Sequence, residues 1–205
     1  QNIFIVLSTA YRNQLYIDEY TLTYKRIGVD VYLTLSAIGL VTALFKIYRA
    51  KSNWFLFRVN GWLFYGVLLF TCFINWDMLI TNFNMVRAAE RDKTLDMDYL
   101  LNLSNSNLDR LLRLKDSSYS MNISDISEFN RNLHFKLYSF LTVMEKLEWQ
   151  SACIEKKRVY NELATISPTI KEINLNNYFI ETLEPLKQLS NLERLNIRYC
   201  RLKNL

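Results

Sequence analysis

The chain has 205 residues, of which half are hydrophobic, and carries a formal net charge of +5. The charge is unevenly placed: the first 76 residues hold seven Lys or Arg against three acids, while the other 129 hold 18 against 17. A nucleic-acid-binding protein would gather positive charge on its soluble face, so the sequence predicts no nucleic-acid partner. The pI near 9.0 is instead typical of basic loops that flank a membrane.

The first 26 residues divide into an apolar and a polar stretch. Residues 2–10 are apolar but too few to span a bilayer, and they lack the basic segment of a signal peptide. We expect them to be the end of an earlier transmembrane helix in a longer protein; the alternative is a short interfacial or buried segment. Residues 11–26 are polar and predict a loop.

Residues 28–48 and 54–76 predict two transmembrane helices. Their central parts, 31–45 and 59–76, contain no charged residue. The second segment has 23 residues, which would reach about 34 Å as a helix, and the hydrocarbon core of a bilayer is about 30 Å thick. A tryptophan at each of its ends suits the membrane interface. The alternative, a pair of buried helices in a soluble bundle, fits this length and lack of charge less well.

The turn between these segments predicts the orientation. Four basic residues and no acid lie in or beside it: Lys46, Arg49, Lys51 and Arg58. The 11–26 loop, by contrast, holds three basic and two acidic residues. Because Lys and Arg in short loops mark the cytoplasmic side, we expect the turn to be cytoplasmic. Residues 77–205 would then lie on the extracytoplasmic side of the cell (inner) membrane.

Residues 77–168 predict an α-helical soluble region. Two short helices are expected first, and Thr94 and Ser106 can cap them. A long helix follows from about Ser124, and another covers about 151–164. Apolar residues spaced three and four apart give the long helix one core-facing side: Ile126, Phe129, Leu133, Leu137, Phe140, Leu141 and Met144.

From residue 169 the apolar spacing changes to a period of 22 residues. Four pairs show it: Ile170 and Leu192, Ile173 and Leu195, Leu175 and Ile197, and Ile180 and Leu202. The pattern resembles a leucine-rich repeat, in which a short LxL strand alternates with an arc. Cys200 occupies the position that such repeats fill with Asn or Cys, and Tyr178 departs from it in the first repeat. The alternative, an amphipathic helix over about 180–195, accounts for leucines at every third residue but not for two LxL segments.

The residues that flank the strand leucines predict a polar binding surface. They are Asn174 and Asn176 in the first repeat, and Asn196 and Arg198 in the second, which the register places side by side. Amides and one cation suit a peptide or a glycan better than an apolar ligand; the alternative is that these residues are simply solvated. So few repeats cannot bury their own core. We therefore expect either the preceding helix to cap the segment or the chain to continue past Leu205.

No motif for catalysis or cofactor binding is present. Without glycine, residues 77–205 can form neither a P-loop nor a GxGxxG turn. His134 is the sole histidine, which excludes a multi-histidine metal site, and we expect it to be half exposed on its helix. No two of the three cysteines are spaced as a CxxC pair. We therefore expect them to be small hydrophobic side chains that are buried: Cys72, Cys153 and Cys200. We expect no enzyme activity and no cofactor.

Four stretches are similar to a family of uncharacterised bacterial multi-pass membrane proteins, a domain-of-unknown-function family: residues 16–29, 75–84, 95–104 and 149–163. The family carries a YGLT..R element before a membrane helix, in which Thr21 here replaces the usual glycine. It also carries an Asn-x-Asp…Asn element after its last membrane helix, here Asn75, Asp77 and Asn84. The resemblance covers about 11–163 and implies further membrane helices upstream, but no activity.

Together these observations predict a mainly α fold: a transmembrane helical hairpin, a helical soluble region and a short leucine-rich-repeat-like β/α segment. The expected domains are 1–76, 77–168 and 169–205. The predicted function is a membrane-tethered protein-interaction module, whose partners are membrane lipid and a protein that binds the repeat segment. The alternative is a subunit of a transport or sensing assembly, for which the two membrane segments offer few ionisable groups.

Overall fold

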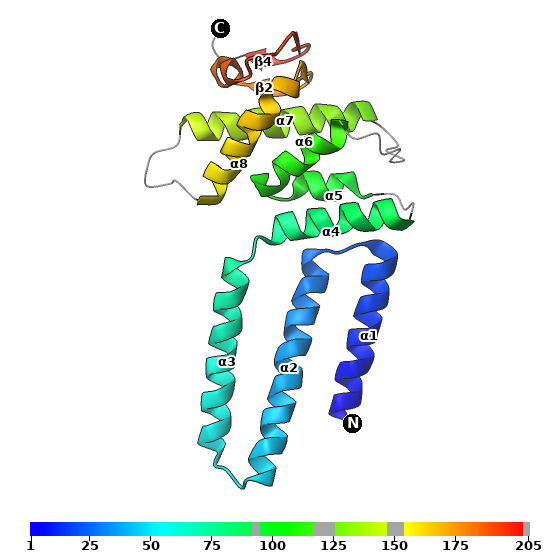
Figure 1. Ribbon diagram of the computed structural model, residues 1–205, viewed down its shortest axis with the longest axis vertical. Helices are drawn as coiled ribbons and strands as arrows, with labels where there is room; N and C mark the ends of the chain where they lie inside the picture. The colour runs from blue at the N-terminus through cyan, green and yellow to red at the C-terminus, as the bar shows by residue number, and fades with distance from the viewer. Residues whose placement is uncertain (92–94, 117–125, 147–153, 203–205) are drawn as a thin grey trace. The chain divides into compact units, whose positions relative to one another are not determined.

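The structure is a computed structural model that describes residues 1–91, 95–116, 126–146 and 154–202. Helices dominate these residues, and short strands follow in the last part of the chain (Figure 1). The chain divides into two compact units, Gln1–Asn84 and Met85–Leu205. Helices form unit 1, whereas unit 2 combines helices with strands.

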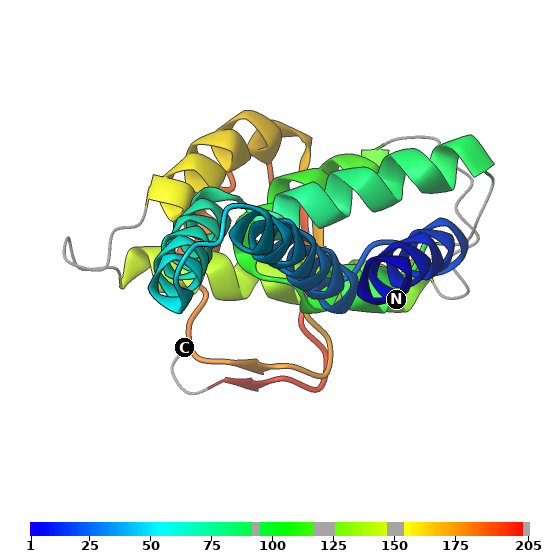
Figure 2. The same ribbon diagram turned by 90° about the horizontal axis from the view of Figure 1, so that it is seen from below.

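Unit 1 contains three long helices and the first part of a fourth: α1 (Asn2–Tyr20), α2 (Tyr24–Tyr48), α3 (Asn53–Phe73) and α4 (Trp76–Arg91). α2 packs against both α1 and α3, as Figures 1 and 2 show. Short turns at 21–23 and 49–52 reverse the chain, so that neighbouring helices run antiparallel.

α2 and α3 are both long and apolar enough to cross a membrane, judged by length and composition alone. They are nevertheless hardly buried. α2 buries Leu33 and Thr42, and of the α3 residues, all of which the structure describes, none is buried. The core helix of a soluble protein is covered by the rest of the chain along its apolar stripe. These two helices instead leave most of their apolar surface uncovered within unit 1.

The polar stretch 11–26 is mostly helical, so the expectation of a loop there is wrong. α1 runs through it as far as Tyr20, because neither glycine nor proline interrupts residues 1–20. Asn13 is buried on this helix and donates hydrogen bonds from Nδ2 to Asp30 Oδ1 (2.7 Å) and to the Arg26 carbonyl oxygen (3.2 Å). These contacts attach the polar part of α1 to the start of α2.

The second apolar segment ends earlier than expected. α3 stops at Phe73, and Ile74 is extended. Trp76 therefore begins α4 rather than ending the predicted span, and its indole N–H donates to the Thr71 carbonyl oxygen (2.9 Å). This bond satisfies a carbonyl near the C-terminus of α3. The tryptophan therefore still lies at that end of α3, although it belongs to α4.

Unit 2 begins with helices grouped around α7: α5 (Met97–Asn102), the 3₁₀ turn η1 (Asn105–Asn107), α6 (Leu108–Asp116), α7 (Ile126–Glu145), α8 (Ile154–Ile166) and the 3₁₀ turn η3 (Ser167–Thr169). α7 contacts α5, α6, the first strand and a later 3₁₀ turn. Its predicted face is confirmed by the burial of Phe129, Leu133, Leu137, Phe140 and Leu141, while Ile126 is 58% exposed.

The helix caps of unit 2 differ in part from expectation. Thr94 and Ser124 lie outside the described residues. α5 is capped instead by Asp96, whose side chain accepts a hydrogen bond from the backbone N–H of Tyr99 (2.9 Å). Ser106 is buried in η1, and Ser104 accepts from its backbone N–H (3.3 Å). Short polar side chains thus satisfy N-terminal amides here, although at shifted positions.

The last part of unit 2 is a set of short parallel strands: β1 (Glu172–Asn174), β2 (Phe179–Ile180), the 3₁₀ turn η4 (Glu184–Gln188), β3 (Arg194–Asn196) and β4 (Arg201–Leu202). β1 pairs with β3, and β2 with β4. Ile173 lies opposite Leu195 and Ile180 opposite Leu202, so the predicted 22-residue register is confirmed. The alternative of a helix over 180–195 is wrong, because this stretch holds a 3₁₀ turn and a strand.

Candidate interaction surface

The strands of unit 2 build a small polar surface. Ile173 and Leu175 are fully buried, so the residues that alternate with them point the other way. Three cross-strand pairs result: Glu172 with Arg194, Asn174 with Asn196, and Asn176 with Arg198. The four candidate residues are therefore brought together as predicted. Sequence reasoning missed Glu172 and Arg194, which the same alternation, taken one step earlier, would have found.

The asparagines are engaged within the ladder. Asn174 Oδ1 accepts a hydrogen bond from the backbone N–H of Asn176 (3.1 Å), and Asn176 Oδ1 accepts one from the backbone N–H of Arg198. Asn196 Nδ2 donates to Glu172 Oε1 (3.1 Å). These residues therefore hold the shape of the surface, whether or not a partner also contacts them.

One cation on this surface has no counter-ion in the part of the chain that the structure describes. Glu172 is shared by Asn196 and by Arg194, whose Nη1 is 3.7 Å from Glu172 Oε2. Among the described residues, the Arg198 guanidinium has neither an ion-pair nor a hydrogen-bond partner. The surface is thus neutral at one end and cationic at the other. Such a guanidinium suits a carboxylate or another hydrogen-bond acceptor, to which charge-assisted bonds are strong.

α7 covers the outer edge of β1. The backbone N–H of Asn174 donates to His134 Nδ1 (2.9 Å). Next to it, the Tyr178 ring stacks on Phe135 with centroids 3.9 Å apart, and its hydroxyl donates to Asn132. His134 is only 3% exposed, so the expectation of a half-exposed histidine is wrong. The physical reason is that a strand edge leaves N–H groups that need acceptors.

Both repeats turn at the same position. Asn177 and Tyr199 are 22 residues apart, and both have positive φ, 68° and 58°. Asparagine tolerates this region, whereas an aromatic residue is strained in it. One residue later the repeats diverge. Cys200 Sγ donates to the Leu175 carbonyl oxygen (2.8 Å), while Tyr178, its counterpart, binds α7. Tyr178, which departs from the Asn or Cys of the repeat pattern, therefore attaches the strand segment to α7.

In unit 1, a cluster of polar side chains surrounds the turn between α1 and α2. Asn84 binds the backbone of Leu22 with both amide atoms: Oδ1 accepts from its N–H (2.7 Å), and Nδ2 donates to its carbonyl (2.9 Å). The Tyr24 hydroxyl donates to Asp77. Asn84 and Asp77 are both buried. The two sequence elements that carry the family resemblance thus meet at one turn, which they hold in place.

Thr21 gives this turn its unusual backbone. Its φ of 88° and ψ of 166° lie in a region that is essentially restricted to glycine. The Arg26 guanidinium donates to the Thr21 carbonyl oxygen, and the Thr21 N–H donates to the Ile17 carbonyl (3.1 Å). The glycine-type geometry is therefore kept although threonine occupies the position, and the surrounding bonds offset the strain.

A pair of carboxyl groups lies between α6 and α8. Asp109 is fully buried, and its Oδ2 is 3.6 Å from Arg110 Nε. Burial first, and then the neighbouring Glu162 carboxyl, raise the pKa of Asp109 to about 6, although Arg158 and Arg110 oppose this. The neighbouring Asp109 carboxyl in turn lowers the pKa of Glu162. Like-charged neighbours commonly split in this way. The sequence carried no signal for the pair, because 53 residues separate its members.

The described residues show no group of three or more His, Cys, Asp or Glu that could hold a metal ion. Cys72 is exposed on α3 and Cys200 is half-buried, so the expectation of buried cysteines is wrong for Cys72. Cys153 lies outside the described residues.

The structure thus defines a mainly helical protein with two apolar helices long enough to cross a membrane and a strand segment near its C-terminal end. The sequence profile of the family described as Domain of unknown function (DUF4153) matches residues 1–114. This is more than half of the chain, which therefore belongs to that family. The match ends before the strand segment, and the stretch 149–163 lies outside it. Comparison with curated proteins and with solved structures found no match.

Proposed function

We propose that this protein is a bacterial multi-pass protein of the inner membrane that presents a leucine-rich-repeat-like surface to a protein partner. α2 and α3 are its spans, and the strand segment is its interaction module. The observation that carries the proposal is the polar surface on the parallel ladder, which ends in Arg198, a cation with no ion-pair partner among the described residues. We propose neither an enzyme activity, nor a cofactor, nor a nucleic-acid partner.

The membrane part of the proposal is supported by the exposure of α3. Trp62 is 70% exposed and Phe70 66%, although both lie in a helix whose only charged residue is Arg58. Water would disfavour so much uncovered apolar surface at about 25 cal/mol per Å², whereas lipid would not. An apolar helix without a polar side is typical of a membrane span.

The repeat part is supported by two features that recur after 22 residues, the strand pairs and the left-handed turn residues. A third feature occurs once: the Cys200 thiol donates to the backbone of the preceding repeat. Solenoid repeats of this kind offer a row of strand side chains as a binding surface. α7 covers one edge of this small array, which is the role of a capping element.

A photo-cross-linking experiment tests the interaction. A photoreactive residue at Arg194, which is on the surface, is expected to give one discrete adduct in intact membranes. The matched control is Lys187, which is also exposed but belongs to the 3₁₀ turn η4 and not to the paired strands. Arg198→Gln is expected to lower the adduct yield at least about tenfold, because a charge-assisted hydrogen bond contributes roughly 1.5–3 kcal/mol. Equal adducts at Arg194 and Lys187 would contradict the proposal.

The proposed orientation places the 49–52 turn in the cytoplasm and unit 2 outside. In a variant without native cysteines, single cysteines at Ser52 and Ser190 report on the two sides, since both residues are exposed. An impermeant maleimide added to intact cells is expected to label position 190 and not position 52. The reverse labelling would invert the topology and leave the interaction hypothesis intact.

The alternative function, a subunit of a transport or sensing assembly, is favoured by one observation. Asn60 lies within α3, and its buried Oδ1 has no hydrogen-bond partner among the described residues. The bond to a neighbouring helix that such a residue usually makes is therefore not supplied by α2. If Asn60→Leu changes the size of the native complex in mild detergent, while Arg198→Gln does not change cross-linking, this alternative replaces the first.

A further inference from the structure

Four cations gather where α2 turns into α3, and we call them the basic turn: Lys46, Arg49, Lys51 and Arg58. No acidic residue occurs between Asp30 and Asp77. Among the described residues, none of the four is paired with a carboxylate. The counter-charge for this cluster must therefore come from outside the described chain.

Aromatic rings and an amide hold three of these cations in place. The Arg49 guanidinium lies 5.6 Å from the Phe45 ring centroid, and that of Arg58 lies 5.9 Å from the Trp54 ring centroid. Lys46 Nζ donates to Asn53 Oδ1. Such cation–π contacts leave the N–H groups at the edge of a guanidinium available to an anion. The basic turn is thus partly preorganised and still open to a ligand.

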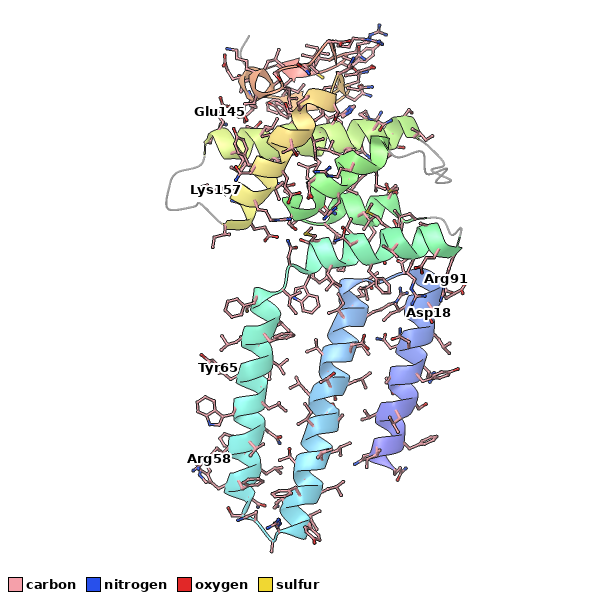
Figure 3. All side chains as sticks on the ribbon, viewed as in Figure 1. Asp18, Arg58, Tyr65, Arg91, Glu145 and Lys157 are labelled. Carbon is pink, nitrogen blue, oxygen red and sulfur yellow. The ribbon has the colours of Figure 1, made fainter. Side chains whose placement is uncertain are left out.

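An apolar groove continues from the basic turn along α3. It has a volume of about 500 Å³ and is lined by Trp54, Phe57, Arg58, Gly61, Trp62 and Tyr65. These residues are spaced three and four apart and share one side of the helix. Arg58 and Tyr65 lie on the side turned away from α2 (Figure 3). Gly61 lies in the middle of this groove, and the space beside its Cα is open, since a Cβ there would meet no atom within 4 Å.

We propose that the basic turn binds the headgroup phosphate of an anionic phospholipid and that the groove beside Gly61 holds one of its acyl chains. This inference rests on the proposed membrane function and adds the ligand class. The ligand must be anionic at one end, to match four unneutralised cations. It must be apolar along the helix axis, to match the aromatic groove. An anionic phospholipid combines both, and the cytoplasmic leaflet, where the basic turn is proposed to lie, is rich in such lipids.

Tryptophan quenching by brominated lipid tests the proposal. The full chain with Trp76→Phe and Trp149→Phe keeps Trp54 and Trp62 as reporters at the groove. It is reconstituted in phosphatidylcholine vesicles that contain a minor fraction of either brominated phosphatidylglycerol or brominated phosphatidylcholine. The quenching titration is expected to show at least about fivefold preference for phosphatidylglycerol, the effect of one basic residue near an anionic surface.

Matched variants separate charge from shape. Changing all four residues of the basic turn to Gln is expected to abolish the preference. The control changes four cations of unit 2 to Gln, Arg113, Lys156, Lys157 and Lys171, and is expected to retain it. Gly61→Leu, which places a bulky side chain in the groove without changing charge, is expected to weaken phosphatidylglycerol binding several-fold. Gly66→Leu, on the same helix but outside the groove, is expected to leave it unchanged.

The possible outcomes are distinguishable. Equal quenching by the two lipids would overturn the lipid site while confirming that α3 is inserted. Quenching by neither lipid would overturn both the site and the proposed membrane function. Loss of the preference on addition of free glycerol phosphate would assign the basic turn to a soluble anion and overturn the phospholipid proposal. An unchanged Gly61→Leu variant would overturn the acyl-chain groove.

Discussion

α3 and α7 have nearly the same length, 21 and 20 residues, but opposite surroundings. α3 carries apolar residues all around the helix, with Arg58 as its only charged residue, and none of its residues, all of them described, is buried. α7 is interrupted by charged residues such as Arg131 and Lys136, and seven of its residues are buried. The more apolar helix is therefore the less covered one.

The difference shows that the pattern of apolar residues, and not their amount, decides what a chain can bury by itself. α7 confines its apolar side chains to one stripe, which a few neighbouring elements can cover. α3 distributes them around the whole helix, and one neighbour, α2, cannot cover them all. Such a helix depends on an apolar environment outside its own chain. The predictions below test this contrast between the two helices and between their units.

The largest effect is expected from Leu137→Ala on α7. Leu137 is fully buried, and truncation of such a leucine costs about 2–5 kcal/mol, because a cavity remains. The matched change on α3, Leu69→Ala, removes a side chain that is 41% exposed and is expected to cost less than about 1 kcal/mol. Hydrogen exchange of the two helices, read by mass spectrometry, measures both free energies. Equal losses would remove the contrast.

Introduction of a charge on the exposed side of each helix is expected to have the larger effect on α3 and the smaller effect on α7. Phe64 on α3 is 59% exposed and Val143 on α7 is 45% exposed. Phe64→Arg is expected to cost about 3 kcal/mol of membrane insertion, whereas Val143→Arg is expected to change stability by at most about 0.5 kcal/mol. The fraction of protein that resists carbonate extraction measures insertion. Full retention of the Phe64→Arg variant would contradict the assignment of α3 as a span.

Asp109 is a buried carboxyl in the core of unit 2, and it predicts a pH dependence. The pKa of Asp109 is raised from 3.8 to about 6 by burial and by the adjacent Glu162 carboxyl, so the folded state favours the protonated form. This stability is fully present below about pH 4 and is lost as the pH rises through about 6. The shift corresponds to roughly 3 kcal/mol. The lowered pKa of Glu162 opposes it, since that stability is present above pH 4.5.

Asp109→Asn is therefore expected to raise the free energy of unfolding at pH 7.5 by about 1–3 kcal/mol and to flatten its dependence between pH 4 and 7. Asp98→Asn on α5 is the control, because Asp98 is exposed. Urea unfolding of the full chain at a series of pH values measures both. A destabilised Asp109→Asn variant would show instead that its ion pair with Arg110 prevails over the cost of burial.

Backbone strain in unit 1 predicts a gain in stability from one substitution. Thr21→Gly is expected to stabilise the turn between α1 and α2 by about 1–3 kcal/mol, since Thr21 has a glycine-type conformation. Thr23, two residues on, has a φ of −134°, so Thr23→Gly is expected to give no gain. Local hydrogen exchange at the start of α2 measures the difference. A loss on Thr21→Gly would show that the threonine side chain has a role in the turn.

The smallest effect is expected at the equivalent turn in unit 2. Tyr199 is 89% exposed and has a φ of 58°, so Tyr199→Gly removes strain with little loss of packing. A gain of about 1 kcal/mol is expected in urea unfolding. Asn177→Gly, at the same position of the other repeat, is expected to change stability by only a few tenths of that, because asparagine tolerates positive φ. Similar gains at both positions would contradict this explanation.

The sequence by itself determined the features that depend on local spacing. Lack of charge predicted α2 and α3, the three-and-four spacing predicted the buried face of α7, and the 22-residue period predicted that Ile173 lies opposite Leu195. Each of these patterns is carried by the periodicity of a helix or a strand, which neighbouring residues define. The polar strand face, with Asn174 beside Asn196, followed from the same alternation.

Only the tertiary structure decided which polar groups meet. His134 accepts from a strand 40 residues away, Asn84 holds the turn at Leu22 from 62 residues away, and Asp109 lies beside Glu162. No periodicity links such residues, because their partners depend on how whole elements pack. A buried N–H or carboxyl must nonetheless find a partner or change its protonation. The sequence shows that such a group needs a partner. Which residue becomes the partner depends on the distant elements that come into contact in the folded protein.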